Sequence, residues 1–123
     1  MKKNYFKLVY QPHLNEIGNP MMEVDSIPEL VDLHDEINFI IMNREYYDEV
    51  VDTLEKVLNG TKEGYSFGYE VYLLECDKED CEVFSWFDNE TIGLFRTQDM
   101  YNMLKEFQEY RDDFYARNRR DTW

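Results

Sequence analysis

The sequence predicts an α+β fold, a single domain in which an antiparallel sheet of about four strands is packed by about three helices. Three observations lead to this prediction. The length of 123 residues suits one hydrophobic core, some segments alternate in apolar character, and others repeat apolar residues at helical spacing. Hydrophobic residues make up 43% of the chain and aromatic residues 16%, which argues against intrinsic disorder. We expect one globular domain over residues 1–123, with residues 117–123 as a frayed tail.

The first predicted strand covers residues 4–11, where Phe6, Leu8 and Tyr10 share one parity. We expect Pro12 to end this strand. Residues 12–25 then show no periodicity and are interpreted as a long irregular stretch. Connectors of this length tend to be mobile or functional.

A first helix near residues 27–38 is predicted by the capping-box spacing of Ser26 and Glu29. Apolar residues follow at helical spacing from Leu30 to Ile41. The apolar run 39–42 either continues this helix or forms a short buried strand, because periodicity does not separate the two over four residues.

A second helix near residues 43–59 has Asn43 as its N-cap and ends at Asn59-Gly60. A third helix near residues 97–116 begins at Thr97, which we expect to cap it. Both segments carry an apolar stripe on one face.

Three more strands are predicted near residues 65–75, 81–87 and 91–96, which are rich in β-forming residues. Their turn-like linkers imply an antiparallel meander. Together with residues 4–11, these segments make up the predicted four-stranded sheet.

The charge balance restricts the class of partner. The chain has 27 acidic and 13 basic residues and a net charge of −14. We expect no direct nucleic-acid binding, because counterion release needs clustered Lys and Arg, and no attraction to an anionic membrane surface. The sequence has no apolar run close to the roughly 20 residues of a membrane span, and Lys7 interrupts the start of any signal-peptide apolar region. With only two cysteines, Cys76 and Cys81, we expect a cytoplasmic protein with reduced thiols.

Acidic residues concentrate in one part of the chain. Twelve of them lie between residues 16 and 55, with Arg44 as the single basic residue there. On the second predicted helix, like charges share the face opposite the apolar stripe, which destabilises a helix by a few tenths of a kcal/mol per pair. We interpret nine residues as a partner-binding surface: Asp32, Asp35, Glu36, Glu45, Tyr46, Asp48, Glu49, Asp52 and Glu55. The alternative is a solvated face that only keeps the protein soluble.

Aromatic residues are more numerous than a small core needs. Tyr46 flanks the acidic face, and a core already filled by Phe and Leu cannot hold all of five further rings: Tyr65, Tyr72, Trp86, Tyr101 and Tyr115. We expect the exposed ones to be interface anchors. The alternative is an aromatic core.

Signals for catalysis or metal binding are weak. The glycines stand apart from one another and no constellation of residues with catalytic roles is visible, so we expect no enzyme and no cofactor. His34 falls on an apolar helix face, as a packed histidine does. Cys76 and Cys81 flank a turn and face each other in the predicted hairpin, but zinc needs two more ligands near them, so we expect no metal site.

The size, the acids of residues 16–55 and the aromatic stretches Tyr65-Ser66-Phe67-Gly68-Tyr69 and Ser85-Trp86-Phe87-Asp88-Asn89-Glu90 resemble the immunity proteins of polymorphic and contact-dependent bacterial toxin systems. The resemblance implies a stoichiometric inhibitor that covers the active cleft or an exosite of a toxin nuclease. The same profile is similar to phage-encoded anti-defence proteins, including anti-CRISPR proteins, which implies a host nucleic-acid-binding effector as the target.

Both resemblances imply the same hypothesis: an acidic protein occludes a basic groove, with carboxylates where substrate phosphates would lie. A third class remains open, an adaptor domain whose acidic face is only solvated. An association rate that does not change with salt concentration would favour that class.

Overall fold

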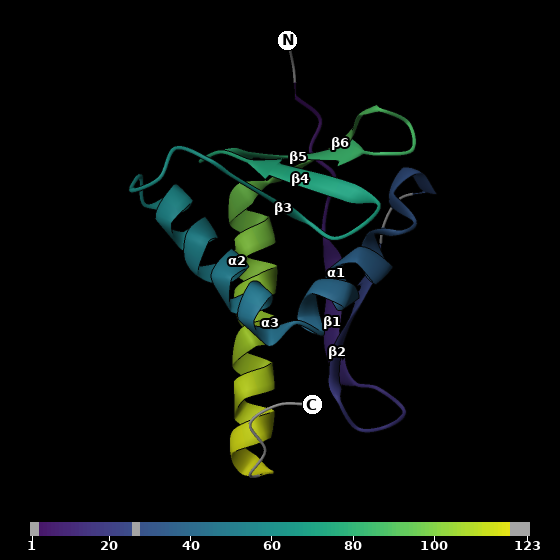
Figure 1. Cartoon of the computed structure of the whole chain (residues 1–123), viewed down its shortest axis with the longest axis vertical. Helices are drawn as coiled ribbons and strands as arrows, with labels where there is room; N and C mark the ends of the chain where they lie inside the picture. The colour runs from purple at the N-terminus through teal and green to yellow at the C-terminus, as the bar shows by residue number, and fades with distance from the viewer. Residues whose placement is uncertain (1–2, 26–27, 119–123) are drawn as a thin grey trace.

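Two antiparallel sheets, three α-helices and one 3-10 turn form the part of the chain that the computed structural model describes, residues 3–25 and 28–118 (Figure 1). The α+β prediction is therefore confirmed. Strands β1 (Val9–Leu14) and β2 (Pro20–Asp25) form one sheet. Strands β3 (Tyr65–Gly68), β4 (Tyr72–Cys76), β5 (Asp80–Ser85) and β6 (Glu90–Arg96) form the other, in that order.

Strands β1 and β2 form a hairpin where we expected an irregular stretch, so that prediction is wrong, and so is the prediction that Pro12 ends a strand. Pro12 lies opposite Met22 in the hairpin register. The backbone N–H and C=O of Met22 both bond the side chain of Asn38, at 3.1 and 2.7 Å. These groups point away from β1, so the missing N–H of Pro12 leaves no partner unsatisfied across the hairpin.

Helix α1 (Leu33–Ile41) holds the open edge of β2 through side chains instead of a further strand. Besides the Asn38 bonds, Nδ1 of His34 accepts the N–H of Val24 at 3.1 Å. His34 is half-buried and hydrogen-bonded, which agrees with its interpretation as a packed histidine. Such long-range contacts are invisible to local periodicity.

The larger sheet differs from the predicted one in two ways. The segment 65–75 makes two strands with a tight turn at residues 69–71, and residues 4–8 are no strand of this sheet. The N-terminal segment touches the sheet beside β6, where the Phe6 N–H donates to the Leu94 carbonyl at 2.8 Å. The antiparallel meander over β4, β5 and β6 is confirmed.

The helices agree with prediction best where the signals are local. Helix α2 (Arg44–Leu58) begins after Asn43, whose side chain accepts the Tyr46 N–H at 3.1 Å. The run at residues 39–42 continues helix α1, with Met42 as its C-cap. Helix α1 begins later than predicted, after a 3-10 turn at Pro28–Leu30, and the expected capping box lies partly outside the described residues, at Ser26.

Helix α3 (Thr97–Arg117) confirms the predicted third helix. Thr97 is its first helical residue rather than its cap, and the Thr97 hydroxyl donates to the Asp77 carbonyl at 2.8 Å, which ties the helix to the β4–β5 turn. The expected frayed tail is helical at residue 117, and residues 119–123 lie outside the described part.

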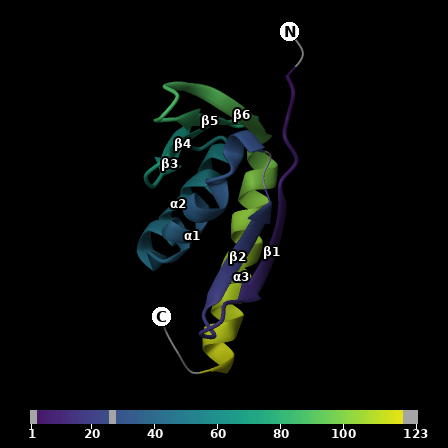
Figure 2. The ribbon, with the colours of Figure 1, turned by 90° about the vertical axis from the view of Figure 1, so that its right-hand side faces the viewer.

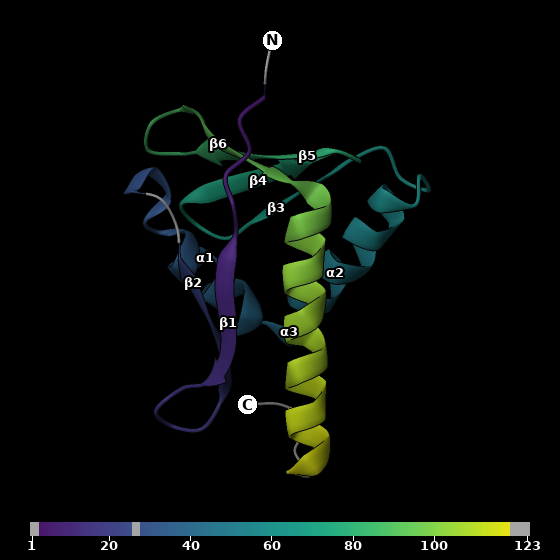
Figure 3. The same ribbon diagram turned by 180° about the vertical axis from the view of Figure 1, so that it is seen from behind.

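The larger sheet covers one end of the molecule, and the three helices pack beneath it (Figure 2). Helices α1 and α2 lie on one side of α3 and the β1–β2 hairpin (Figure 2). Seen from behind, the long α3 runs beside the hairpin (Figure 3). The core between these layers contains Leu33, Ile37, Tyr47, Leu54 and Phe107. Packing in this way leaves the outer faces of α1 and α2, and the turns of the sheet, open to solvent.

Candidate protein-binding surface

Helix α2 displays a row of carboxylates. Its inner face buries Tyr47, Val50, Val51, Leu54 and Val57, and this stripe turns the opposite side outward. Four exposed acids lie on that side, and we call them the outer face of α2: Glu45, Glu49, Asp52 and Glu55. These four of the nine predicted site residues are thus brought together on one helix.

The outer face of α2 has little compensating charge. Asp52 pairs with Lys56 at 3.3 Å, an exposed contact of the weak surface type. The Tyr101 hydroxyl approaches Glu55 at 3.5 Å. Among the described residues, neither Glu45 nor Glu49 has a cation within 4.0 Å. Within the described part of the chain, no ion pair at Glu45 or Glu49 therefore offsets the like-charge repulsion that the sequence predicts.

Asp48 differs from its neighbours because it faces α3. Its carboxylate accepts hydrogen bonds from buried Arg111 at 2.8 Å and from Gln108 at 3.0 Å. Burial alone would lower the pKa of Arg111, but hydrogen bonds from its guanidinium to Asp112 and Asp48 outweigh burial and raise this pKa. Asp48 therefore joins α2 to α3. The prediction that it is a free partner-binding acid is wrong, because its carboxylate is already bonded to Arg111 and Gln108.

Glu36 is no surface residue, contrary to the prediction, because it is only 1% exposed. Its carboxylate accepts the backbone N–H groups of four successive residues in the β3–β4 turn, 69–72, at distances from 2.6 to 3.2 Å. Consecutive N–H groups in a turn form a concavity that suits an anion, so this carboxylate fixes the shape of the turn. The burial of Glu36 could have been predicted from the sequence, since Glu36 has helical spacing to Leu33 and Ile40 in the buried stripe.

The other two predicted acids lie on or just before helix α1. Asp35 is exposed, whereas Asp32 precedes the helix and is half-buried, with no side-chain capping bond. They belong to a different helix from the outer face of α2.

Tyr46 connects the acidic helix to the sheet. Its hydroxyl donates to the Gly68 carbonyl at 2.8 Å and accepts the Gly68 N–H at 3.0 Å. It therefore occupies the polar groups of the edge strand β3 and is only half-exposed. A Cβ at Gly68 would lie 2.2 Å from the Tyr72 carbonyl oxygen, so this turn requires glycine.

The aromatic residues singled out in the sequence differ in exposure. Tyr72 and Tyr115 are buried and are therefore no exposed anchors, and Tyr65 and Tyr101 are half-buried. The core takes more rings than expected because Tyr side chains can satisfy their hydroxyls internally, as Tyr47 does with the Leu104 carbonyl at 2.7 Å.

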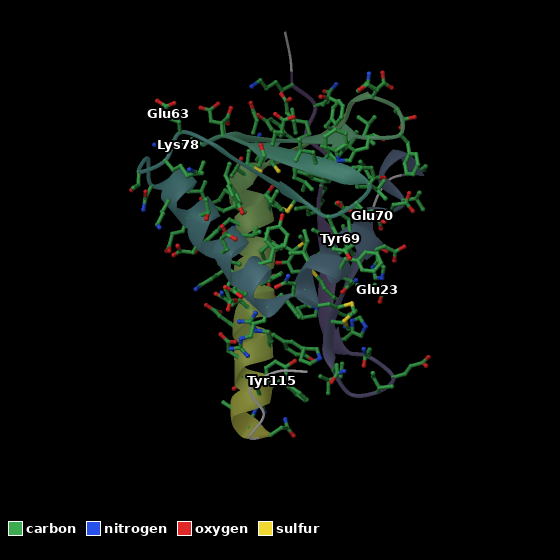
Figure 4. The ribbon with its side chains drawn as sticks, in the orientation of Figure 1. Glu23, Glu63, Tyr69, Glu70, Lys78 and Tyr115 are labelled. Carbon is green, nitrogen blue, oxygen red and sulfur yellow. The ribbon has the colours of Figure 1, made fainter. Side chains whose placement is uncertain are left out.

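Trp86 is exposed as predicted, at 57%. Three further rings are exposed that we did not predict as anchors, Phe39 at 41%, Tyr69 at 57% and Phe87 at 83%. We call Phe39, Tyr69, Trp86 and Phe87 the turn surface. Figure 4 shows Tyr69 beside Glu70 at the β3–β4 turn, next to α1.

Two contacts organise the turn surface. The rings of Phe39 and Tyr69 stack with centroids 4.8 Å apart. The backbone N–H of Trp86 donates to the Val71 carbonyl at 3.1 Å, so the β3–β4 and β5–β6 turns lie side by side at one end of the sheet. The only sequence signal for this arrangement was the exposed-looking aromatic stretch 85–90.

Asp80 fastens the N-terminal segment to the sheet. It accepts hydrogen bonds from Lys3 and Tyr5, and Arg96 lies over the Tyr5 ring at 4.2 Å. The hydrogen bond from Lys3, and to a smaller extent the one from Tyr5, lower the pKa of Asp80.

Cys76 and Cys81 lie opposite each other in the β4–β5 register, as expected, and both are buried free thiols. A hydrogen bond between them and burial raise the pKa of Cys81 well above its ordinary value, which keeps this thiol protonated and unreactive. Within residues 3–25 and 28–118, no three side chains of His, Cys, Asp or Glu gather as a metal site.

No protein-family model, curated protein or solved structure matches this chain. Over the described part of the chain, none of the helices has the length and apolar character needed to cross a bilayer. The exposed groups of the described residues include carboxylates along α2 and aromatic rings at the sheet turns. Such groups suit binding to a protein of opposite charge.

Proposed function

We propose that this protein is an acidic inhibitor that binds and neutralises a basic nucleic-acid-acting protein, as an immunity protein neutralises its cognate toxin nuclease. The observation that supports this function most is the outer face of α2, with four exposed carboxylates and one paired cation. A cytoplasmic location is part of the proposal, and the facing, unbridged thiols of Cys76 and Cys81 support it.

The spacing of the carboxylates favours a groove that binds nucleic acid. Ten residues separate Glu45 from Glu55, which is about 15 Å along a helix. One strand of duplex DNA carries a phosphate about every 3.4 Å of axis, or roughly four over that length. The outer face of α2 offers four carboxylates, so a basic cleft would meet a similar line of charge.

Occlusion is the proposed mechanism. The carboxylates attract the basic cleft over long range and speed encounter, and the protein then covers the cleft or an adjacent exosite. Its own fold does not depend on these four side chains, because none of them is buried.

The test compares two triple variants as pull-down baits in a lysate of the source cells. In the first, Glu45→Lys, Glu49→Lys and Asp52→Lys reverse the outer face of α2 and leave Asp48 to hold α3. In the control, Glu16→Lys, Glu23→Lys and Asp25→Lys make the same charge change on the exposed side of the β1–β2 hairpin.

We expect the wild-type and control baits to capture one basic nuclease or nucleic-acid-binding protein at low salt and to release it at high salt. The α2 variant should capture little of it. Equal capture by the two triple variants, or capture of no basic protein by any bait, would contradict the proposal.

A further inference from the structure

The turn surface exposes rings that the protein's own core does not use. Phe87 is 83% exposed and Trp86 57%, and both lie in the short loop between β5 and β6. The free energy of a large aromatic ring is much lower when the ring is buried than when it is in water. Exposed clusters of such rings therefore mark contact sites.

The backbone under these rings is fixed before any partner arrives. Four N–H groups of the β3–β4 turn bond the buried Glu36 carboxylate. In the β5–β6 loop, the Asn89 N–H donates to the Ser85 carbonyl at 2.8 Å, and the Asp88 N–H donates to the Ser85 hydroxyl at 3.2 Å. Rings on a preorganised backbone lose little conformational entropy on binding.

Acidic groups surround the rings. Glu70 follows Tyr69, and Asp88 and Glu90 follow Phe87; all three acids are exposed. Tyr46, in the first turn of α2, bonds Gly68 beside the β3–β4 turn, so the start of the acidic helix lies next to this region.

We propose that the turn surface binds arginine side chains of the basic partner protein. This inference rests on the proposed function, which makes the partner basic. A guanidinium is planar and weakly hydrated, so it stacks on an aromatic ring and pairs with a carboxylate in one contact. A lysine ammonium has the same charge but is more strongly hydrated and stacks less well. The aromatic rings therefore select arginine, whereas the outer face of α2 attracts any cation.

Two probe peptides separate these effects: nona-arginine and nona-lysine, matched in charge and length. Labelled peptides are titrated with the full-length protein and with four variants, and binding is followed by fluorescence anisotropy. The ring variant is Tyr69→Ala with Trp86→Ala. Its control is Ile17→Ala, which removes an exposed apolar side chain from the β1–β2 turn.

The third variant, Tyr69→Leu with Trp86→Leu, keeps apolar volume without the rings, so the test does not depend on the alanine variant remaining folded. The fourth is the triple lysine variant of the outer face of α2. Circular dichroism checks each fold.

We expect the wild-type protein and Ile17→Ala to prefer nona-arginine over nona-lysine about three- to tenfold, the size of one or two exposed cation–π contacts. Both ring variants lose two of the four rings of the turn surface and should lower this preference at least twofold, while nona-lysine affinity changes less than twofold. Equal affinity of the wild-type protein for the two peptides, or an undiminished preference in a folded ring variant, would overturn the inference.

The triple lysine variant shows which proposal fails. If this variant lowers the affinity for both peptides equally while the ring variants leave both affinities unchanged, the charge basis of the proposed function stands and the arginine site does not. If it leaves both affinities unchanged, the acidic face is no binding surface, and the ring variants alone decide the arginine site.

Discussion

Glu36 supports the β3–β4 turn with one carboxylate that accepts four backbone N–H groups. Replacing Glu36 with Ala leaves those donors without their partner in a buried place. We expect Glu36→Ala to lower the free energy of unfolding by about 3 kcal/mol, because backbone donors that are partly or fully buried lose a charged acceptor. Denaturant unfolding measures this change.

The control for Glu36 is its neighbour Asp35, which is exposed. Asp35→Ala should change the free energy of unfolding by less than about 0.5 kcal/mol, as surface substitutions do. If the two variants lose the same stability, the carboxylate of Glu36 does not fix the turn.

Asp48 and Glu49 make a second matched pair. Asp48→Ala removes a hydrogen-bond acceptor from buried Arg111, which keeps Asp112 as its other acidic partner. We expect a loss of about 1–3 kcal/mol for Asp48→Ala, against less than about 0.5 kcal/mol for Glu49→Ala, which lies on the exposed side. Thermal unfolding with a van't Hoff analysis measures both, and a larger loss for Glu49→Ala would show that Asp48 does not join the helices.

At the scale of elements, the contact between the N-terminal segment and the sheet should depend on pH. Hydrogen bonds from Lys3 and Tyr5 lower the pKa of Asp80 in the folded protein below its ordinary value of 3.8. A lowered carboxyl pKa stabilises the fold above the unfolded-state pKa, and this stabilisation is lost as pH falls through the folded-state pKa.

We therefore expect Asp80→Asn to be less stable than the wild type near pH 7, and this difference to shrink as the pH falls below about 4. Denaturant unfolding of both proteins from pH 7 to pH 2.5 measures the difference at each pH. A difference that stays constant across this range would show that the charge of Asp80 does not stabilise the contact.

Elements with local signals were predictable from the sequence. The N-cap Asn43 and an unbroken apolar stripe predicted α2, and polar turns predicted the meander of β4, β5 and β6. The β1–β2 hairpin was not predicted, because the side chain of Asn38 satisfies β2 from a distant helix and makes Pro12 harmless there.

In the candidate site too, local patterns were predictable and long-range contacts were not. Helical spacing correctly placed Glu45, Glu49, Asp52 and Glu55 on one exposed face. It did not reveal that Asp48 meets a cation from α3, or that the Tyr69 ring lies on Phe39, because both contacts join residues that are far apart in the chain.

At the scale of the whole molecule, the net charge of −14 should dominate encounter with a basic partner. We expect the association rate constant with the captured protein to fall at least tenfold between about 0.02 M and 0.5 M salt, while the dissociation rate constant changes much less. Stopped-flow mixing over this salt range measures both. An association rate that ignores salt would instead favour a solvated acidic face.

Inhibition of the partner is measured by titrating the captured protein's nuclease activity with this protein. Wild-type protein should abolish cleavage at an equimolar ratio in low salt, while the variant with Glu45, Glu49 and Asp52 changed to Lys should leave most of it. Full nuclease activity in the presence of excess wild-type protein would contradict the claim.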